Sequence, residues 1–94
     1  VDYHTHIAGY GTKELDWWHD REIRHETGYT TDLLTRHACA FIEQNDKKPF
    51  FLYLAQAAPH NPWQGRDPNK KQAPVEHYKE MIAVLDESVG AVMD

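Results

Sequence analysis

The chain has 94 residues and a mass of 11.0 kDa, which suits one small domain and excludes two. Ten Lys and Arg residues against 15 Asp and Glu residues give a net charge of −5, which argues against nucleic-acid or anionic-membrane partners, because these attract basic surfaces. The mean hydropathy is −0.77, so we expect no membrane insertion. One cysteine, Cys39, excludes an internal disulfide.

Residues 1–28 show no sustained period and predict a loop-rich segment that can include a short strand. This segment opens with the pattern D-x-H-x-H, which places His4 and His6 two residues apart. If the backbone is extended, both imidazoles point to one side, a spacing that can chelate zinc. The alternative is that they contact solvent or substrate. Trp17 and Trp18 fit either a carbohydrate-stacking wall or ordinary packing.

A helical period begins at Thr30 and predicts a helix over residues 30–45. Its apolar face is formed by side chains at helical spacing: Leu33, Leu34, His37, Ala38, Phe41 and Ile42. Thr30 or Thr31 can cap the first turn. Asn45 and Asp46, followed by Pro49, end the helix, because the residue before a proline disfavours the α conformation.

Residues 50–55 form a continuous apolar run, which predicts a buried central strand of a parallel sheet. A lone strand is not stable in water, so its neighbours should lie outside these residues. A proline-rich loop follows, and a second helical period predicts a helix over residues 76–94. The order helix, strand, loop, helix indicates an α/β layered fold, and we expect the chain to be an internal piece of a longer protein.

His60 is the leading catalytic candidate. In open α/β sheets, ligands bind beyond the carboxyl ends of the strands, where residues 57–62 would lie. Pro59 and Pro62 restrict the backbone on both sides of His60 and would fix the direction of its ring. An imidazole so placed can donate a proton or a charge-assisted hydrogen bond near neutral pH, unless it only caps a turn.

Five blocks in order carry a resemblance to a known family. They read GYTTDLL (28–34), AFI (40–42), KPFFLYLA (48–55), APHNP (58–62) and LDESVG (85–90). Together they closely resemble the middle of the sulfatases, in the arylsulfatase branch. The opening residues 2–6 resemble the preceding segment of N-acetylgalactosamine-4-sulfatase-like members. This resemblance accounts for His4 and His6 without a new metal site.

The resemblance implies an alkaline-phosphatase-like α/β/α sandwich that hydrolyses sulfate esters of saccharides or aryl alcohols. Residues 1–94 would be an internal part of one catalytic domain. Within it, residues 1–28 would form a substrate-side segment and residues 29–94 a helix–strand–loop–helix unit. It further implies that His60 contacts the sulfate or the leaving-group oxygen, with His4 and His6 as candidate substrate contacts. Export to a periplasmic, extracellular or lysosomal compartment is common in the family.

The family's nucleophile is a formylglycine made within a C/S-x-P/A-x-R motif, and a calcium ion binds the sulfate. Cys39 lies in C-A-F-I-E and does not match that motif, so we expect both the formylglycine and the calcium ligands outside this chain, with no metal site within it. The chain alone should then be inactive. Two alternatives stay open: a zinc-dependent amidohydrolase or phosphoesterase using His4 and His6, and a sulfatase-like scaffold without catalysis.

Overall fold

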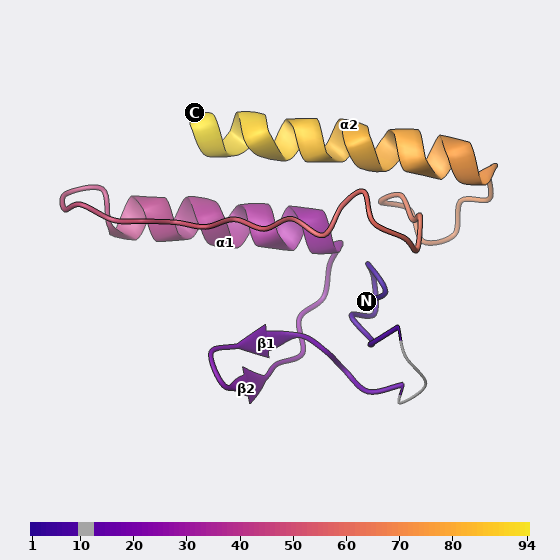
Figure 1. The fold of residues 1–94 in the computed structure, drawn as a ribbon, viewed down its shortest axis with the longest axis horizontal. Helices are drawn as coiled ribbons and strands as arrows, with labels where there is room; N and C mark the ends of the chain where they lie inside the picture. The colour runs from indigo at the N-terminus through magenta and orange to yellow at the C-terminus, as the bar shows by residue number, and fades with distance from the viewer. Residues whose placement is uncertain (10–12) are drawn as a thin grey trace.

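The computed structural model describes residues 1–9 and 13–94. The described elements are two short antiparallel strands and two helices (Figure 1), namely β1 (Trp18–His19), β2 (Glu22–Ile23), α1 (Thr30–Gln44) and α2 (Pro74–Met93). The helices lie side by side, and the hairpin lies on the side of α1 away from α2 (Figure 1). The loop-rich segment predicted for residues 1–28 therefore contains a paired hairpin.

The hairpin turns on Asp20 and Arg21, between His19 and Glu22, which are paired across the two strands. Asp20 has a φ of +57°, in the left-handed region that a two-residue hairpin turn often needs and that aspartate tolerates better than most residues. Only two residues pair on each strand, and within residues 1–9 and 13–94 the two strands form a sheet of their own.

The helix predicted over residues 30–45 is confirmed as α1, although its buried face is narrower than predicted. Leu33 and Ala38 are buried, whereas His37 is exposed. The capping prediction is wrong: Tyr29 is the N-cap and makes no side-chain cap bond. The hydroxyl of Thr30 instead donates to the carbonyl of Tyr3 at 3.2 Å, so this end of the helix is tied to the N-terminal segment.

The second predicted helix is confirmed as α2, which begins two residues earlier than expected. Pro74 occupies its first turn, where a residue without a backbone N–H is tolerated. Met81, Val84 and Ser88 recur along the face that is buried. Among the described residues, neither helix combines the length and the apolar character that crossing a membrane requires.

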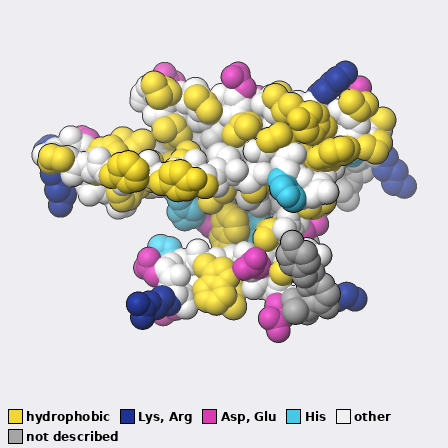
Figure 2. All heavy atoms as spheres, in the orientation of Figure 1, with side chains coloured by type: hydrophobic (Ala, Val, Ile, Leu, Met, Phe, Trp, Pro, Cys, Tyr) yellow, Lys and Arg dark blue, Asp and Glu magenta, His cyan; other side chains and the backbone are white. Residues whose placement is uncertain are grey.

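The strand predicted over residues 50–55 is not formed in this structure. The segment is extended and runs along α1 (Figure 1), but it has no ladder partner among the described residues. Phe51 and Tyr53 are 86% and 80% exposed, while Leu52 and Leu54 are half-buried. Figure 2 shows the resulting run of apolar side chains in front of α1. The prediction failed because backbone pairing requires neighbouring strands, which these residues do not supply.

A polar seam joins the extended segment to both helices. The hydroxyls of Thr35 on α1 and Ser88 on α2 are hydrogen-bonded to each other, and Gln56 donates to the hydroxyl of Ser88 at 2.8 Å. Gln56 directly follows the apolar run, so this seam fixes where the run ends. Residues 57–62, which carry His60, start from that fixed point.

The main apolar cluster lies where the N-terminal segment, the start of α1 and the middle of α2 meet. Its buried members are Tyr3, Tyr29, Ala58, Met81 and Val84. Ala58 belongs to the loop that carries His60, so this loop is packed into the cluster at one point while its tip stays at the surface.

Arg66 crosslinks the loop after His60 to both helices. Its guanidinium donates two hydrogen bonds to Asp32 on α1, at 2.9 and 3.0 Å, and one to Glu87 on α2, at 2.7 Å. These hydrogen bonds raise the pKa of Arg66, which keeps the guanidinium charged. The backbone N–H of Arg66 also donates to Glu80 at 2.8 Å. The loop is thus held at both of its ends.

Candidate functional site

The opening D-x-H-x-H segment forms a tight turn rather than an extended strand. One carboxylate oxygen of Asp2 accepts the backbone N–H groups of His4 and Thr5 at 2.9 and 2.7 Å, and the carbonyl of Asp2 accepts that of His6 at 2.9 Å. An aspartate that binds backbone amides two and three residues ahead stabilises a turn. The extended backbone that would place both imidazoles on one side is therefore not formed.

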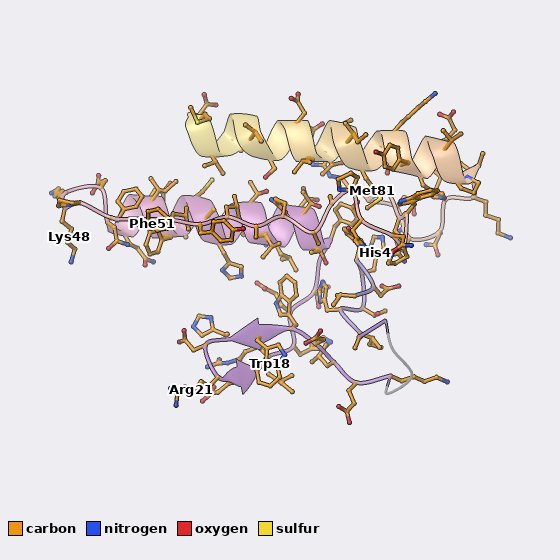
Figure 3. The ribbon with its side chains drawn as sticks, viewed as in Figure 1. His4, Trp18, Arg21, Lys48, Phe51 and Met81 are labelled. Carbon is orange, nitrogen blue, oxygen red and sulfur yellow. The ribbon has the colours of Figure 1, made fainter. Side chains whose placement is uncertain are left out.

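The rings of His4 and His6 bind carbonyls in two different segments. His4 Nε2 donates to the carbonyl of Gly65 at 2.8 Å, and His6 Nε2 donates to that of Gly28 at 2.9 Å. A carbonyl only accepts, so Nε2 of each ring carries a proton. His6 is 1% exposed and stacks on Trp17 at 4.3 Å. Figure 3 shows His4 beyond the start of α1, far from Trp18 and Arg21 on the hairpin. The role of His4 and His6 in substrate binding stays a prediction.

Asp2 also anchors the loop that follows His60. Its second carboxylate oxygen accepts the side-chain amide of Gln64 at 2.8 Å, and the side-chain carbonyl of Gln64 accepts the backbone N–H of Tyr3 at 2.8 Å. Partial burial by itself would raise the pKa of Asp2, but the hydrogen bonds from Thr5, Gln64 and His4 outweigh it and lower the pKa to about 2. The carboxylate is therefore charged at neutral pH.

Two buried tyrosines hold the backbone of the same loop. The hydroxyl of Tyr3 donates to the carbonyl of His60 at 2.9 Å, and the hydroxyl of Tyr29 donates to that of Gln64. Burial raises the pKa of Tyr3 above its ordinary value and, with the nearby charges, raises that of Tyr29 to about 12. Both phenols therefore keep their protons and remain donors. We call these contacts of Asp2, Tyr3, Tyr29 and Gln64 the loop clamp.

His60 lies at the tip of the clamped loop with its side chain exposed. Its backbone N–H donates to the carbonyl of Ala57 at 3.0 Å, and its ring Nδ1 is 2.6 Å from the carbonyl oxygen of Asn61. Nδ1 must donate in this contact, which fixes the ring direction and the position of one proton. Within the described chain no hydrogen bond engages Nε2, which is therefore the atom available to a ligand.

An open, shallow hollow surrounds the His60 ring. It is lined by Ala57, Pro59, His60, Asn61, Trp63 and Tyr78. Trp63 and Tyr78 pack edge to face with their ring centres 5.4 Å apart, so α2 supports one wall of the hollow. The arrangement offers an imidazole nitrogen, an amide and an aromatic ring to a ligand at the surface.

A second hollow lies between the hairpin and α1. Glu26 joins its two sides, because its carboxylate accepts the indole N–H of Trp17 at 2.9 Å and lies 2.9 Å from Nε2 of His37. Slight burial would raise the pKa of Glu26, but the hydrogen bonds from His37 and Trp17 outweigh it and lower the pKa. Trp17 is thus a packed residue, and this region does not converge on His60.

Acidic, histidine and cysteine side chains are the groups of this chain that could hold a metal ion. No three His, Cys, Asp or Glu side chains converge within residues 1–9 and 13–94. The carboxylate of Asp2 already accepts hydrogen bonds from two backbone N–H groups and one side-chain amide. A calcium site on residues outside this chain stays a prediction, as does the formylglycine.

Comparison with known proteins decides the family. The family model described as Sulfatase matches residues 2–94, which is nearly the whole chain. The chain belongs to the sulfatase family. This match confirms the resemblance that the five sequence blocks carry, and it also covers the N-terminal segment containing His4 and His6.

The relatives of this sulfatase chain are much longer than the chain itself. It is 45% identical over 49 residues to an N-acetylglucosamine-6-O-sulfatase of Bacteroides thetaiotaomicron, an alignment that covers 51% of the chain and 9% of the relative. The crystal structure of Ps i-CgsB superposes with a TM-score of 0.70 and 39% identity, covering 81% of the chain and 19% of that protein. The same values hold for its complex with k-i-k-neocarrahexaose. The chain is therefore part of a sulfatase domain, an α/β fold, and it spans less than a fifth of each of these relatives.

Sequence reasoning missed the residues that hold and flank His60. Tyr3, Tyr29 and Gln64 fix the loop backbone, and Trp63 lines the hollow. The partners Tyr3 and His60 are 57 residues apart, and no spacing rule connects residues at that separation. The one available signal was the tryptophan directly after the APHNP block.

Proposed function

We propose that the complete protein carrying this chain is a sulfuric ester hydrolase and that His60 acts in its active site. Family membership across residues 2–94 is the observation that carries the proposal. The placement of His60 supports it, because the ring direction is fixed through Nδ1 and the residue lines an open hollow. Saccharide sulfates and aryl sulfates are the two substrate classes that we consider.

The chemistry assigned to His60 is local. Hydrolysis of R–O–SO₃⁻ breaks the S–O bond, and negative charge develops on the leaving oxygen unless a proton reaches it. A protonated Nε2 can donate a hydrogen bond to that oxygen and pass it the proton, so that the alcohol leaves as ROH. Nδ1 stays bound to the carbonyl of Asn61 throughout, which holds Nε2 in one direction.

The nucleophile and the sulfate-binding ion belong to the rest of the protein in this proposal. A formylglycine would supply the attacking oxygen, and calcium would neutralise the sulfate charge. Export of the protein, as in many family members, is part of the same expectation. No zinc site on His4 and His6 is proposed, because both rings are committed to backbone carbonyls in separate segments.

The test is sulfate release by the complete protein. We expect turnover of N-acetylglucosamine 6-sulfate, k-i-k-neocarrahexaose or 4-nitrophenyl sulfate, and a fall in kcat/KM of about 100-fold or more in His60→Ala. His19→Ala is the matched control, since it removes an exposed histidine from the hairpin, and it should leave the rate unchanged. A His60→Ala rate within a few-fold of wild type would contradict the role of His60. Absence of formylglycine in the intact mass would support the non-catalytic scaffold.

A further inference from the structure

We propose that Trp63 forms a sugar-binding platform beside His60, so that the ester hydrolysed at this site is a saccharide sulfate. The inference rests on the function proposed above and narrows its substrate class. It starts from one geometric fact: Trp63 and His60 line the same hollow, three residues apart on one clamped loop.

The indole is available to a ligand and held in place. Trp63 is 44% exposed, although tryptophan carries a large apolar surface that usually packs inside. Its ring is inclined at 65° to that of Tyr78, so the two rings meet edge to face rather than covering each other by stacking. Part of the indole therefore stays at the surface of the hollow while α2 limits its movement.

The loop clamp fixes the backbone on both sides of Trp63. The carbonyl of His60 is held by Tyr3 and that of Gln64 by Tyr29, so residues 61–63 lie between two fixed points. A platform that is ordered before the ligand arrives loses little conformational entropy on binding. Because the loop backbone is held, the exposed part of the Trp63 indole presents one defined surface to a ligand.

The polar groups around the indole favour a saccharide over an aryl group. A pyranose ring places C–H groups on one face, which pack on an indole, and hydroxyls at its edge, which need hydrogen-bond partners. The side chain of Asn61, which is exposed and lines the same hollow, can supply such a partner, while His60 serves the leaving oxygen. An aryl group gains mainly by leaving water, and a shallow, open hollow buries it poorly.

Trp18 provides an internal comparison. It is 56% exposed, but it lies on the hairpin, outside the His60 hollow, and its indole N–H is bound to Asp16 at 2.8 Å. Both tryptophans expose aromatic surface to water, and they differ in whether His60 is beside them. Substitution of Trp18 therefore controls for the general effect of removing an exposed indole.

The experiment measures substrate-dependent kinetics on the complete protein. Trp63→Leu should lower kcat/KM about tenfold, mainly through KM, for whichever of N-acetylglucosamine 6-sulfate and k-i-k-neocarrahexaose the wild type hydrolyses faster. The same variant should keep kcat/KM for 4-nitrophenyl sulfate within threefold. Trp63→Phe should recover part of the loss in kcat/KM. Trp18→Leu should leave kcat/KM unchanged for both the saccharide and 4-nitrophenyl sulfate. Equal losses on both substrates, or no loss on the saccharide, would overturn the platform.

Binding measured without turnover separates this inference from the proposed function. Titration of the wild type with k-i-k-neocarrahexaose should change tryptophan fluorescence, and Trp63→Leu should abolish the change while Trp18→Leu keeps it. If the wild type releases no sulfate from any probe but shows this pattern, the hydrolase proposal fails and the platform stands. If sulfate is released but Trp63→Leu binds the oligosaccharide as wild type does, the platform fails alone.

Discussion

The hydroxyl of Tyr3 donates to the carbonyl oxygen of His60 at 2.9 Å, which joins the N-terminal segment to the loop that carries the candidate catalytic histidine. Tyr3 is 2% exposed, and its own backbone N–H and carbonyl are bound by Gln64 and Thr30. Because Tyr3 is buried and its backbone is hydrogen-bonded, its hydroxyl has a fixed position and determines where the His60 backbone lies. Tyr3 is thus a positioning residue for His60.

Tyr3→Phe removes this hydroxyl and leaves the ring in the core. We expect the free energy of unfolding to fall by about 1 kcal/mol, because one partly buried hydrogen bond is lost. We also expect kcat for the sulfate ester to fall about tenfold with little change in KM, because the imidazole loses its fixed position. Tyr29→Phe is the matched control, since it removes the equivalent bond to Gln64, farther from the ring. Equal kcat losses in the two variants would show that Tyr3 stabilises the loop in general and does not position His60 specifically.

Gly65 and Gly90 should respond in opposite directions to alanine. A Cβ at Gly65 would lie 1.6 Å from a carboxylate oxygen of Glu80, the same oxygen that accepts the backbone N–H of Arg66. Glu80 must then move and give up that bond, so Gly65→Ala should cost about 1 kcal/mol. A Cβ at Gly90 meets no atom within 4 Å in the described chain, and Gly90→Ala should stabilise the helix by about 0.5–1 kcal/mol.

Urea unfolding of the complete protein measures both glycine variants against wild type. The midpoint should fall for Gly65→Ala and rise for Gly90→Ala at an unchanged slope. A Gly65→Ala protein as stable as wild type would show that Glu80 relocates freely and that the close approach does not constrain the loop.

Asp2→Asn should change how stability depends on pH. The folded pKa of Asp2, about 2, lies below the ordinary value of 3.8, so the carboxylate favours the folded state above pH 4 and this contribution disappears as the pH falls towards 2. The free energy of unfolding should be about 1 kcal/mol larger for wild type than for Asp2→Asn at pH 6, a value reduced for solvent screening. The difference should shrink progressively below pH 4. The check is the free energy of unfolding of both proteins across that range; a constant difference would contradict the assigned pKa.

Local sequence patterns predicted the two helices well, because helical periodicity and terminal residues act within one turn of the chain. Pro74 shifted the start of α2 by two residues, and Thr30 turned from a cap into a contact with Tyr3. The strand expected over residues 50–55 could not be judged locally, since an apolar run becomes a strand only when neighbours pair with it. The Asp2 carboxylate stabilises the turn that contains His4. The two-residue spacing of His4 and His6 does not reveal this turn, because the same spacing also fits an extended backbone with both rings on one side.

For the candidate site, sequence reasoning gave the family correctly and proposed His60, whose role stays a prediction, but it found none of the residues that hold the loop. The APHNP block with its two prolines is contiguous in sequence, so the sequence alone is enough to find it. The contact of Asp2 with Gln64 spans 62 residues and forms only when the fold closes. Positioning contacts of this kind depend on tertiary structure, so the roles of Trp63 and the loop clamp have no signature in the local sequence.

The exposed aromatic side chains of Phe50, Phe51 and Tyr53 have a practical consequence for producing this polypeptide. An extended segment with free backbone groups and large apolar rings readily pairs with copies of itself. Expressed alone, residues 1–94 should precipitate as inclusion bodies, and a double replacement by lysine at Phe51 and Tyr53 should return the material to the supernatant.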